Sequence, residues 1–556
     1  MKALSTPDYI VFLCYFVLIV SYGLWIYYRK KKEATTSNDY FLAEGSLTWW
    51  AIGASLIASN ISAEQFVAMS GSGFKLGLAI ATYEWMAAIV LIIVAVFFIP
   101  VYLKNRIFTM PQFLKQRYNG TVAMIMAVFW LALYIVINLT SILYLGALAI
   151  SSISGFDITA CMVFLGIFSI FITLGGMKVI GYTDVIQVFF LILGGLVTTY
   201  LALNLVADEF GGSGVFDGFA FMGEKAGSHF DMIFTKDNPN YDELPGISVL
   251  IGGMLITNLY YWGCNQYITQ RALGADLKTA RSGILFAAFL KLLMPLIVVI
   301  PGIAAFVLYQ QGHFQTEMML DGKLHHDSAY PVLLNLLPSG LKGLAFAALT
   351  AAIVASLAGK ANSIATIFTL DIYKQKIDKD ASEKKQVTIG KITVVLSILT
   401  AIIIAPFLGI EKGGFKFIQE FSGFLSPGVF AMFLLGFFWK KTTANAAMYS
   451  MIGGFVFSVI LKFLPGFVNL EPLYSIGFAV VNPDTGLYEI PFLDRMGIVF
   501  VLCIVGMFYI SRKETGKGDD VNSLEVDTSM FRVDRSFMIG TAVLVALVAA
   551  LYAYFW

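Results

Sequence analysis

The chain has 556 residues, of which 58% are hydrophobic and 13% are charged, and its mean hydropathy is +0.78. Soluble domains carry about 25% charged residues, so this composition excludes a soluble globular protein. It indicates an all-α polytopic membrane protein whose partner is the lipid bilayer. The net charge of +1 and the lack of a large basic cluster argue against a nucleic-acid partner.

Cysteine and histidine positions exclude several kinds of site. The 4 cysteines all lie in apolar runs and form no CxxC pair, so we expect isolated thiols rather than a disulfide or metal framework. The 4 histidines fall in predicted loops. Because the sequence also shows no nucleophile–base pair and no phosphate-binding loop, we expect no enzymatic activity.

About 20 apolar residues span a bilayer, and this length defines the membrane spans. The sequence contains about 14 such apolar runs, which predict 14 transmembrane helices: 8–28, 47–72, 76–103, 122–153, 158–177, 183–206, 245–270, 283–310, 338–371, 389–409, 415–438, 443–463, 491–511 and 536–556.

Charge in the loops predicts the orientation of these spans. The first run is too long for a signal peptide, and its basic residues follow it, so it predicts a spanning helix with an external N-terminus. The loops that are then cytoplasmic contain 25 Lys and Arg residues, and the external loops contain 7. This bias follows the positive-inside rule and places both termini outside a bacterial-type cytoplasmic membrane. The long external loops 207–244 and 311–337 are expected to cap the molecule, and the polar segment 513–530 is expected to be flexible.

The second span is a poor bilayer helix between Ser55 and Gly73. Polar residues crowd it at membrane depth: Ser55, Ser59, Asn60, Ser62, Glu64 and Gln65. Such residues cost free energy in a bilayer unless they face a cavity, a partner helix or a substrate. Ser and Asn also compete for backbone hydrogen bonds, which predicts a break at 58–62 whose carbonyls can bind a cation. The alternative is a kinked packing helix with polar interhelical contacts.

A second interrupted span suggests an internal repeat. The seventh span carries Gly252-Gly253 and then a polar aromatic run, 258–266. The two copies lie five spans apart and therefore face opposite ways, which is the arrangement of an inverted repeat around a transport site. The predicted domains are a peripheral helix and loop, inverted repeat 1, an external loop, inverted repeat 2 and peripheral helices, at 1–46, 47–206, 207–244, 245–438 and 439–556.

Polar and aromatic residues gather in the predicted spans. Amides, a carboxylate and an ammonium can pair with a ring of hydroxyls, and an aromatic face can stack on a sugar ring. This combination favours a neutral sugar or polyol as the small-molecule partner. The candidate substrate-binding residues are Asn60, Gln65, Tyr83, Glu84, Asn258, Tyr261, Trp262, Lys291 and Gln419. A structural ion pair between Lys291 and Glu84 is the alternative interpretation of the two charges.

The candidate cation site combines the break with the ninth span. Backbone oxygens of Ala58 and Ile61, the Ala352 carbonyl and the Ser356 hydroxyl could surround Na⁺. The ninth span is rich in small residues, so a plain packing face is the alternative interpretation.

Several long motifs resemble those of the sodium/solute symporter family, and most closely its bacterial sodium/galactose (SGLT-type) branch. They are residues 60–66 (NISAEQF), 81–86 (ATYEWM), 183–190 (TDVIQVFF), 258–263 (NLYYWG), 265–271 (NQYITQR) and 433–443 (FLLGFFWKKTT). The resemblance implies a LeuT-type 5+5 inverted-repeat fold that works by alternating access. It implies sugar contacts at Asn60, Gln65, Glu84, Asn258, Lys291 and Gln419, and sodium at Ala58, Ile61, Ala352 and Ser356. It also implies an inner gate at Tyr261 and outer-gate residues Met69, Tyr83 and Phe415.

The chain departs from this family pattern at the sodium site. The family usually has two adjacent serines where this chain has Ala355-Ser356, and Lys360 follows one turn later. Ala87 also stands where the branch usually has a serine. Two hypotheses follow: Lys360 replaces the ion, or it opposes the ion by charge repulsion. In either case Asp184, on the implied ion path, is its expected partner.

The function expected from the sequence is Na⁺-coupled symport of a galactose- or glucose-like hexose, with Na⁺ as the coupling ion and no organic cofactor. The alternative is a sodium-independent or proton-coupled sugar carrier in which Lys360 replaces the sodium ion. A sugar sensor is disfavoured because the chain lacks a signalling domain. The identity of the sugar, the stoichiometry and the oligomeric state stay open at this point.

Overall fold

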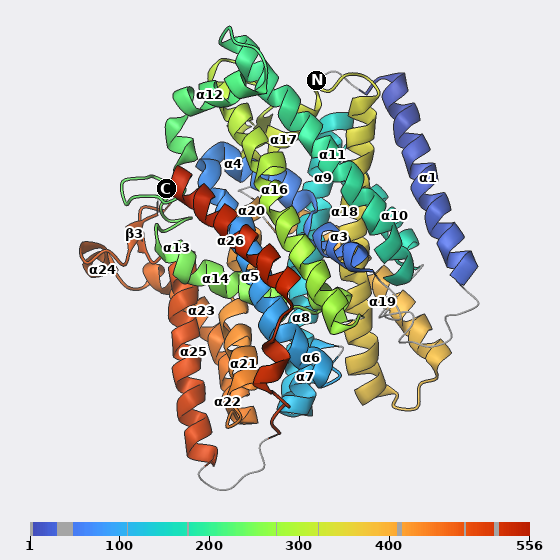
Figure 1. Cartoon of the computed structure of the whole chain (residues 1–556), viewed down its shortest axis with the longest axis vertical. Helices are drawn as coiled ribbons and strands as arrows, with labels where there is room; N and C mark the ends of the chain where they lie inside the picture. Colours follow the sequence, from blue (N-terminus) through green and yellow to red (C-terminus); the bar gives the residue numbers. More distant parts are fainter. Residues whose placement is uncertain are drawn as a thin grey trace. The chain divides into compact units, whose positions relative to one another are not determined.

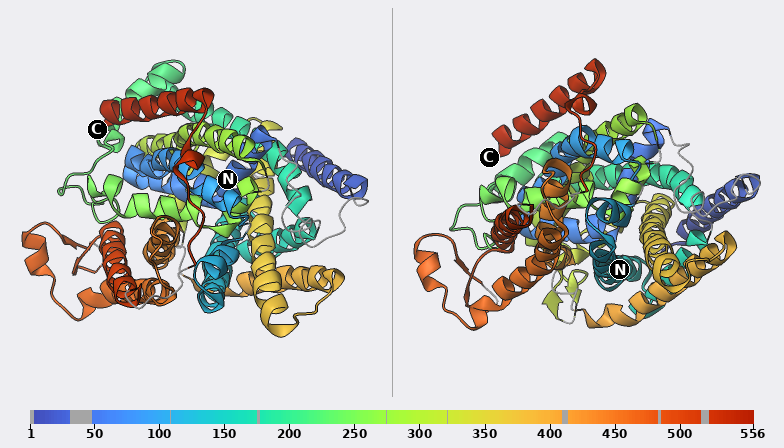
Figure 2. Two further views of the ribbon diagram at one scale, coloured as in Figure 1. Left: turned by 60° about the horizontal axis from the view of Figure 1, so that its bottom comes forward. Right: turned by 90° about the horizontal axis from the view of Figure 1, so that it is seen from below.

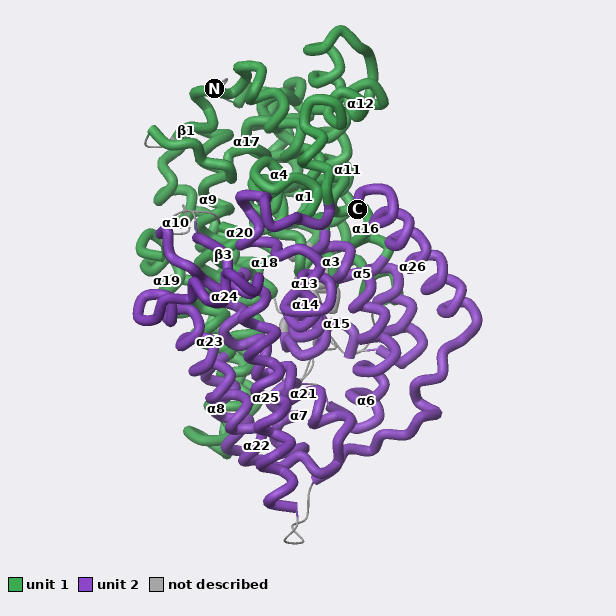
Figure 3. The backbone as a smooth tube through the Cα atoms, turned by 90° about the vertical axis from the view of Figure 1, so that its left-hand side faces the viewer, with its two compact units in different colours: residues 1–81, 130–231, 289–418 green, residues 82–129, 232–288, 419–556 purple. Residues whose placement is uncertain are grey.

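The computed structural model describes residues 4–30, 48–107, 109–174, 177–273, 275–320, 322–408, 414–482, 485–515 and 522–556, and most of these residues are helical (Figure 1). The chain forms two compact units, coloured separately in Figure 3. Unit 1 contains residues 1–81, 130–231 and 289–418, and unit 2 contains residues 82–129, 232–288 and 419–556. Each unit draws on both predicted repeats, so the repeat boundaries stay a prediction.

Within the described residues, nine helical stretches are long and apolar enough to cross a membrane, and a bent helix pair is a further candidate. Thr6–Tyr22 and Ile158–Thr173 are shorter apolar helices. Of the 14 predicted runs, five do not meet this length test: the two shorter helices, the bent pair, and the second and seventh spans, which are broken into short helices. The all-α, multi-pass architecture expected from composition is confirmed.

In unit 1, α18 (Leu341–Thr366) is the central helix. It packs against α1 (Thr6–Lys30), α10 (Ile158–Thr173), α11 (Met177–Glu209) and α19 (Glu383–Ile404). Its many alanines explain this position, because small residues let neighbouring helices approach closely. Figures 1 and 2 show α1 at the margin of the unit. The loop predicted after α1 falls at 31–47, outside the described residues.

In unit 2, α14 (Gly253–Gly263) has the corresponding central place. It packs against α5 (Thr82–Ile93), α21 (Ser426–Phe438) and α25 (Phe492–Thr515). A Cβ atom on Gly253 would lie 2.2 Å from the carbonyl oxygen of Leu493. The glycine therefore permits the close approach of α14 to α25.

Both breaks predicted from sequence are present. In the second span, α3 (Trp49–Asn60) ends before η2 (Glu64–Met69) begins. In the seventh span, α13 (Ser248–Ile251), α14 and α15 (Gln266–Leu273) are separate helices, with a break at Gly252 as expected. A third break was not predicted: α20 (Gly414–Gly423) and α21 meet at an angle of 48°.

Within the described residues, five helical segments are π-helical rather than α-helical. They are η2, η4 (Val94–Phe98), η5 (Leu133–Leu139), η8 (Ile367–Ile377) and η11 (Tyr449–Gly453). The remaining helices of four or more residues are α4 (Ser70–Leu76), η3 (Gly77–Ala81), α6 (Ile99–Lys104), α7 (Met110–Arg117), α8 (Gly120–Ala132), α9 (Thr140–Ser154), α12 (Val215–Lys225), η6 (Gly227–Phe230), α16 (Leu277–Gln310), α17 (Ala329–Leu334), α22 (Ala444–Met448), α23 (Gly454–Phe463), α24 (Glu471–Ser475), η13 (Thr528–Phe531) and α26 (Arg535–Phe555).

The loops predicted to be external caps carry structure of their own. Loop 207–244 contains α12. Loop 311–337 contains the hairpin β1–β2 (Met319–Leu320 and Lys323–Leu324), the short η7 (His326–Ser328) and α17. A second two-stranded sheet, β3–β4 (Val480–Val481 and Tyr488–Glu489), lies between α24 and α25. The two other short helices are η9 (Ala405–Phe407) and η12 (Leu464–Gly466).

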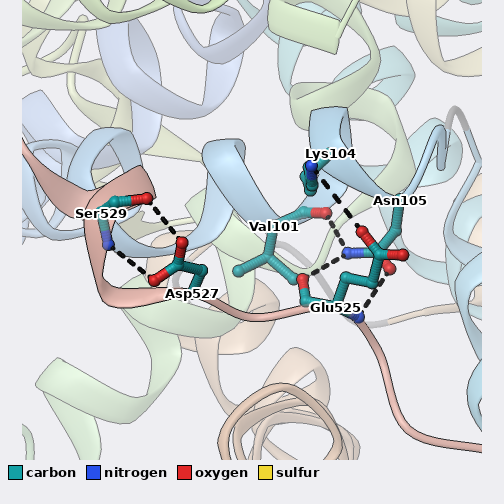
Figure 4. Close-up of polar contacts among 6 residues, drawn as sticks. All are labelled: Val101, Lys104, Asn105, Glu525, Asp527 and Ser529. Atoms are coloured by element: carbon teal, nitrogen blue, oxygen red, sulfur yellow. Dashed lines mark hydrogen bonds and ion pairs between the residues drawn. The ribbon is translucent and has the colours of Figure 1, made fainter.

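The segment predicted to be flexible, 513–530, is partly held in place within unit 2. Asn105, at the end of α6, donates to the carbonyl of Glu525 at 3.0 Å and accepts from its N–H at 2.9 Å (Figure 4). Lys104 Nζ lies 3.7 Å from the Glu525 carboxylate. Asp527 accepts two hydrogen bonds from Ser529. Residues 513–515 belong to the end of α25, and hydrogen bonds hold Glu525 and Asp527. The flexibility of the remaining described residues stays a prediction, and residues 516–521 lie outside the described part.

Candidate functional site

The predicted site residues fall into two sets, one in each unit. Unit 1 contains Ala58, Asn60, Ile61, Gln65, Met69, Asp184, Lys291, Ala352, Ser356, Lys360 and Phe415; unit 2 contains Tyr83, Glu84, Asn258, Tyr261, Trp262 and Gln419. Most of the side chains with assigned exposure are buried, while Tyr261 and Gln419 are partly exposed. Each set is described within its own unit.

The break in the second span is formed by local hydrogen bonds between residues 62 and 65. The Glu64 N–H donates to Ser62 Oγ at 3.2 Å, and the Ser62 N–H donates to Gln65 Oε1 at 3.3 Å. This reciprocal pattern resembles the capping box that starts a helix. It holds the first turn of η2 and engages the amide oxygen of Gln65.

Lys291 of α16 and Asn60 at the end of α3 are brought together, as expected for a polar site. The Lys291 ammonium donates to Asn60 Oδ1. Lys291 is 1% exposed and Asn60 is 8% exposed, so the ammonium is held in an environment where a charge is costly. Donor groups of this kind can pair with sugar hydroxyls.

The residues predicted to bind sodium all lie in unit 1. Ala58 is in the last turn of α3, Ile61 follows its end, and Ala352 and Ser356 lie one turn apart on α18. The Ser356 hydroxyl donates to the carbonyl of Ser59 at 3.3 Å. This contact joins α18 to the end of α3, where carbonyls lack partners within the helix. The residues present offer oxygen ligands of the kind that unwound backbone supplies to Na⁺.

Lys360 is paired with a carboxylate that sequence reasoning did not assign to it. Its Nζ lies 3.7 Å from Glu64 Oε1, with side-chain exposures of 4% and 12%. The predicted partner, Asp184, lies on α11, but its side chain is outside the described residues, so that pairing stays a prediction. The available signal was that Glu64 is the sole carboxylic acid in the polar stretch 55–73.

A loop carboxylate lies beside the two unit 1 residues expected in the outer gate. Asp327 of η7 accepts from the Gly414 N–H at 3.0 Å, next to Phe415. It also packs on α4, because a Cβ atom on Gly71 would lie 2.4 Å from Asp327 Oδ1. Burial raises the pKa of Asp327 to about 7. Sequence reasoning missed this residue, since an acid in a loop gives no burial signal.

Half of the unit 2 set is aromatic. The rings of Tyr261 and Trp262 lie edge to face with centroids 5.2 Å apart. Asn258 Nδ2 donates to the Met254 carbonyl at 3.1 Å within α14. Tyr83 and Glu84 are buried on α5, the helix that packs on α14. The set therefore combines ring faces with polar groups, as a sugar-contacting surface requires.

An ionic cluster lies beside Gln419 on α20. Glu420 Oε1 lies 2.5 Å from Lys462 Nζ and 2.6 Å from Arg495 Nη2. The Arg495 side chain is 7% exposed and that of Glu420 is 13% exposed. This cluster fixes α20 against α23 and α25 and so orients the turn that carries Gln419.

The model of the sodium:solute symporter family matches residues 40–454. The chain is 45% identical over 561 residues to a sodium/glucose cotransporter of Vibrio parahaemolyticus, covering 100% of this chain and 99% of that protein. It is 32% identical over 495 residues to the human sodium/myo-inositol cotransporter 2, covering 85% of this chain and 72% of that protein.

Among solved structures, the substrate-bound, outward-open state of a Na⁺-coupled sialic acid symporter matches with a TM-score of 0.74 at 21% identity. The match covers 92% of this chain and 98% of that one. At this identity the likeness shows the fold alone, and the LeuT-type fold expected from the motifs is confirmed.

Proposed function

Because this chain belongs to the sodium:solute symporter family, we propose that it uses the sodium gradient to carry a hexose inward by alternating access. The observation that carries the proposal is the end of α3, where the Ser356 hydroxyl of α18 contacts the Ser59 carbonyl. This is the place where a transporter's broken helix offers oxygen to a coupling ion. Moving one charge through 100 mV supplies about 2.3 kcal/mol for accumulation of a neutral solute.

Sodium would be held by the Ala58, Ile61 and Ala352 carbonyls and the Ser356 hydroxyl. The chain supplies one serine hydroxyl at 355–356 rather than two, so we expect lower sodium affinity than a two-serine site would give. Since the ion acts as a coupling ion, it is bound on one side of the membrane and released on the other. This role makes the protein a transporter rather than an enzyme.

The proposed sugar contacts are the residues expected from sequence. In unit 1, the Lys291 ammonium and the amides of Asn60 and Gln65 would pair with hydroxyls. In unit 2, Tyr261 would stack on the ring as the inner gate, and the polar contacts would come from Tyr83, Glu84, Asn258, Trp262 and Gln419. Met69, Tyr83 and Phe415 would form the outer gate.

The substrate class is a cyclic polyol. The two relatives described above are named for glucose and for myo-inositol, and both compounds are rings of hydroxyl groups. We assign a galactose- or glucose-like hexose to this chain, with inositol as the competing substrate to test. The Lys and Arg bias of the loops places both termini on the external side of a bacterial-type cytoplasmic membrane.

Uptake into proteoliposomes tests this function. Radiolabelled glucose, galactose and myo-inositol are offered under an inward gradient of Na⁺, of K⁺ or of protons. We expect concentrative hexose uptake with Na⁺ alone. Equal uptake without Na⁺, or uptake driven by protons, would instead support the carrier in which Lys360 replaces the sodium ion. No uptake of any of the three compounds would contradict the substrate class.

A further inference from the structure

The ion pair of Lys360 and Glu64 connects α18, which carries two of the proposed sodium ligands, to η2, which begins just after the break that carries Ile61. Lys360 lies on α18 one turn after Ser356, which itself lies one turn after Ala352, so the three share a helix face. Glu64 begins η2, three residues after Ile61. The Nζ–Oε1 separation is 3.7 Å. The pair therefore joins α18 to η2, on one side of the break, whereas the Ser356–Ser59 contact joins α18 to α3 on the other side.

A lone ammonium at this position would oppose sodium binding. Side chains one helical turn apart are about 5–6 Å apart at Cβ, and at this range two like charges repel strongly in a low-dielectric interior. A buried lysine also requires a partner, because an unpaired charge inside a membrane protein is costly. A carboxylate that neutralises the ammonium removes the repulsion of sodium and also gives the buried lysine its partner.

The local hydrogen bonds explain why Glu64 can act as this partner. The Ser62–Gln65 pattern fixes the first turn of η2 and thus the direction of the Glu64 side chain. An acid in the first turn is also favoured by the helix dipole. Glu64 is therefore held next to Lys360 by its own backbone.

We propose that Glu64 is a positioning residue for sodium coupling: it neutralises Lys360 and fixes η2 against α18, so that sodium binds although one serine hydroxyl is missing at Ala355. This inference rests on the proposed sodium-coupled function. Under this inference the lysine does not replace the ion. Together with Glu64 it forms a neutral pair beside the ion site.

A double-mutant cycle tests the inference. The proteins are the wild type, Glu64→Gln, Lys360→Met and the double variant. For each, the sodium concentration that half-activates hexose uptake is measured in proteoliposomes, and the sodium-dependent rise in melting temperature, relative to potassium, is measured in detergent. Lys342→Met is the matched control, because Lys342 is also a buried lysine on α18, yet lies ten residues before Ala352.

We expect Glu64→Gln to raise the half-activating sodium concentration roughly 10-fold or more, since it removes the carboxylate that pairs with the Lys360 ammonium. Lys360→Met should lower that concentration, because an unpaired carboxylate attracts cations. In the double variant, the half-activating sodium concentration should return to within about 3-fold of the wild-type value. If the two side chains acted independently their effects would add, whereas removing both charges of one pair restores neutrality. Lys342→Met should leave the sodium response unchanged.

Unchanged sodium dependence in Glu64→Gln would overturn the inference while leaving the proposed function intact. A wild type that carries sugar and melts without any response to sodium, with a response gained in Lys360→Met, would show that the lysine replaces the ion. That result would overturn both proposals. If Glu64→Gln does not fold, the double variant tests the inference instead. The inference predicts that this variant folds and responds to sodium like the wild type. Loss of the sodium response in the double variant would contradict the inference.

Discussion

The second and seventh spans are both interrupted helices, but different residue types form the two breaks. In unit 1 the break between α3 and η2 is built from polar residues and is bordered by a buried ion pair, a buried lysine and a serine hydroxyl. In unit 2 the break before α14 is built from glycine, which packs directly on the backbone of Leu493, and it leads into the Tyr261–Trp262 pair. The difference indicates that substitutions in unit 1 should change ion or polar recognition, whereas those in unit 2 should first disturb packing.

The largest effect is expected for Gly253→Ala in unit 2. The added methyl group would lie 2.2 Å from the Leu493 carbonyl oxygen, so α14 must move away from α25, and overpacking of this kind costs about 1–3 kcal/mol or more. We expect a lower yield of folded protein and a lower melting temperature in detergent. Gly497→Ala on α25 is the control, since a Cβ atom there meets nothing within 4 Å. Equal stability of the two variants would contradict this account of the break.

Next in size is Lys291→Met in unit 1. The substitution removes the ammonium that donates to Asn60, and hydrogen bonds to charged groups contribute about 1.5–3 kcal/mol each. Because the same ammonium is proposed to pair with a sugar hydroxyl, we expect hexose uptake at limiting sugar to fall roughly 10- to 100-fold. Steady-state uptake against sugar concentration checks this result, with Lys342→Met as the matched control. Sugar uptake at the wild-type level would remove Lys291 from the site.

Ser356→Ala should have a smaller and more selective effect. It removes the single serine hydroxyl at 355–356, so we expect roughly 10-fold weaker sodium activation, in line with the loss of one polar contact. The apparent sugar affinity at saturating sodium should stay the same. The reverse change, Ala355→Ser, should strengthen sodium activation. Titrations of uptake with NaCl at constant ionic strength measure the sodium activation of both variants. An equal loss of sugar affinity in Ser356→Ala would contradict a role of Ser356 in sodium binding alone.

The smallest expected effect concerns pH and Asp327. Its pKa is raised by burial from 3.8 to about 7, so the folded protein holds a proton there that the unfolded chain loses at lower pH. Stability from this group is therefore complete below about pH 4 and is lost as the pH rises through 7. Asp327→Asn keeps the packing without the charge and should show a flatter profile of melting temperature between pH 5 and 8. Parallel profiles for the two proteins would contradict a buried, protonated Asp327.

Sequence reasoning located the functional elements better than their partners. The break at 58–62 and the break at Gly252 could be predicted because both depend on local chemistry, and the family motifs added the fold. The Lys360–Glu64 contact could not be predicted, because it joins residues nearly 300 positions apart across a break whose geometry the sequence does not set. The bend between α20 and α21 was missed because residues 423–427, Gly-Phe-Leu-Ser-Pro, lie in a run whose length fits one span.

The π-helical segments also limited prediction. A π turn holds one residue more than the i→i−4 ladder allows, so the residues that follow it face a different direction from the one an α-helical count gives. η8 follows Thr366 without a break, so a count of α-helical turns from Lys360 toward the C-terminal end of this helix gives wrong directions for the side chains. Assignments near Lys360, where the helix is still α-helical, are unaffected.

The same five π-helical segments affect which insertions and deletions this chain can tolerate during evolution. A π turn is a place where a helix already accommodates an extra residue, so a single-residue deletion there can restore regular α-helical geometry instead of breaking the span. Insertions and deletions should therefore be tolerated in segments such as η4 and η11 more readily than in α18 before Thr366. In α18, losing one residue between Ser356 and Lys360 would turn Lys360 by about 100° about the helix axis relative to Ser356.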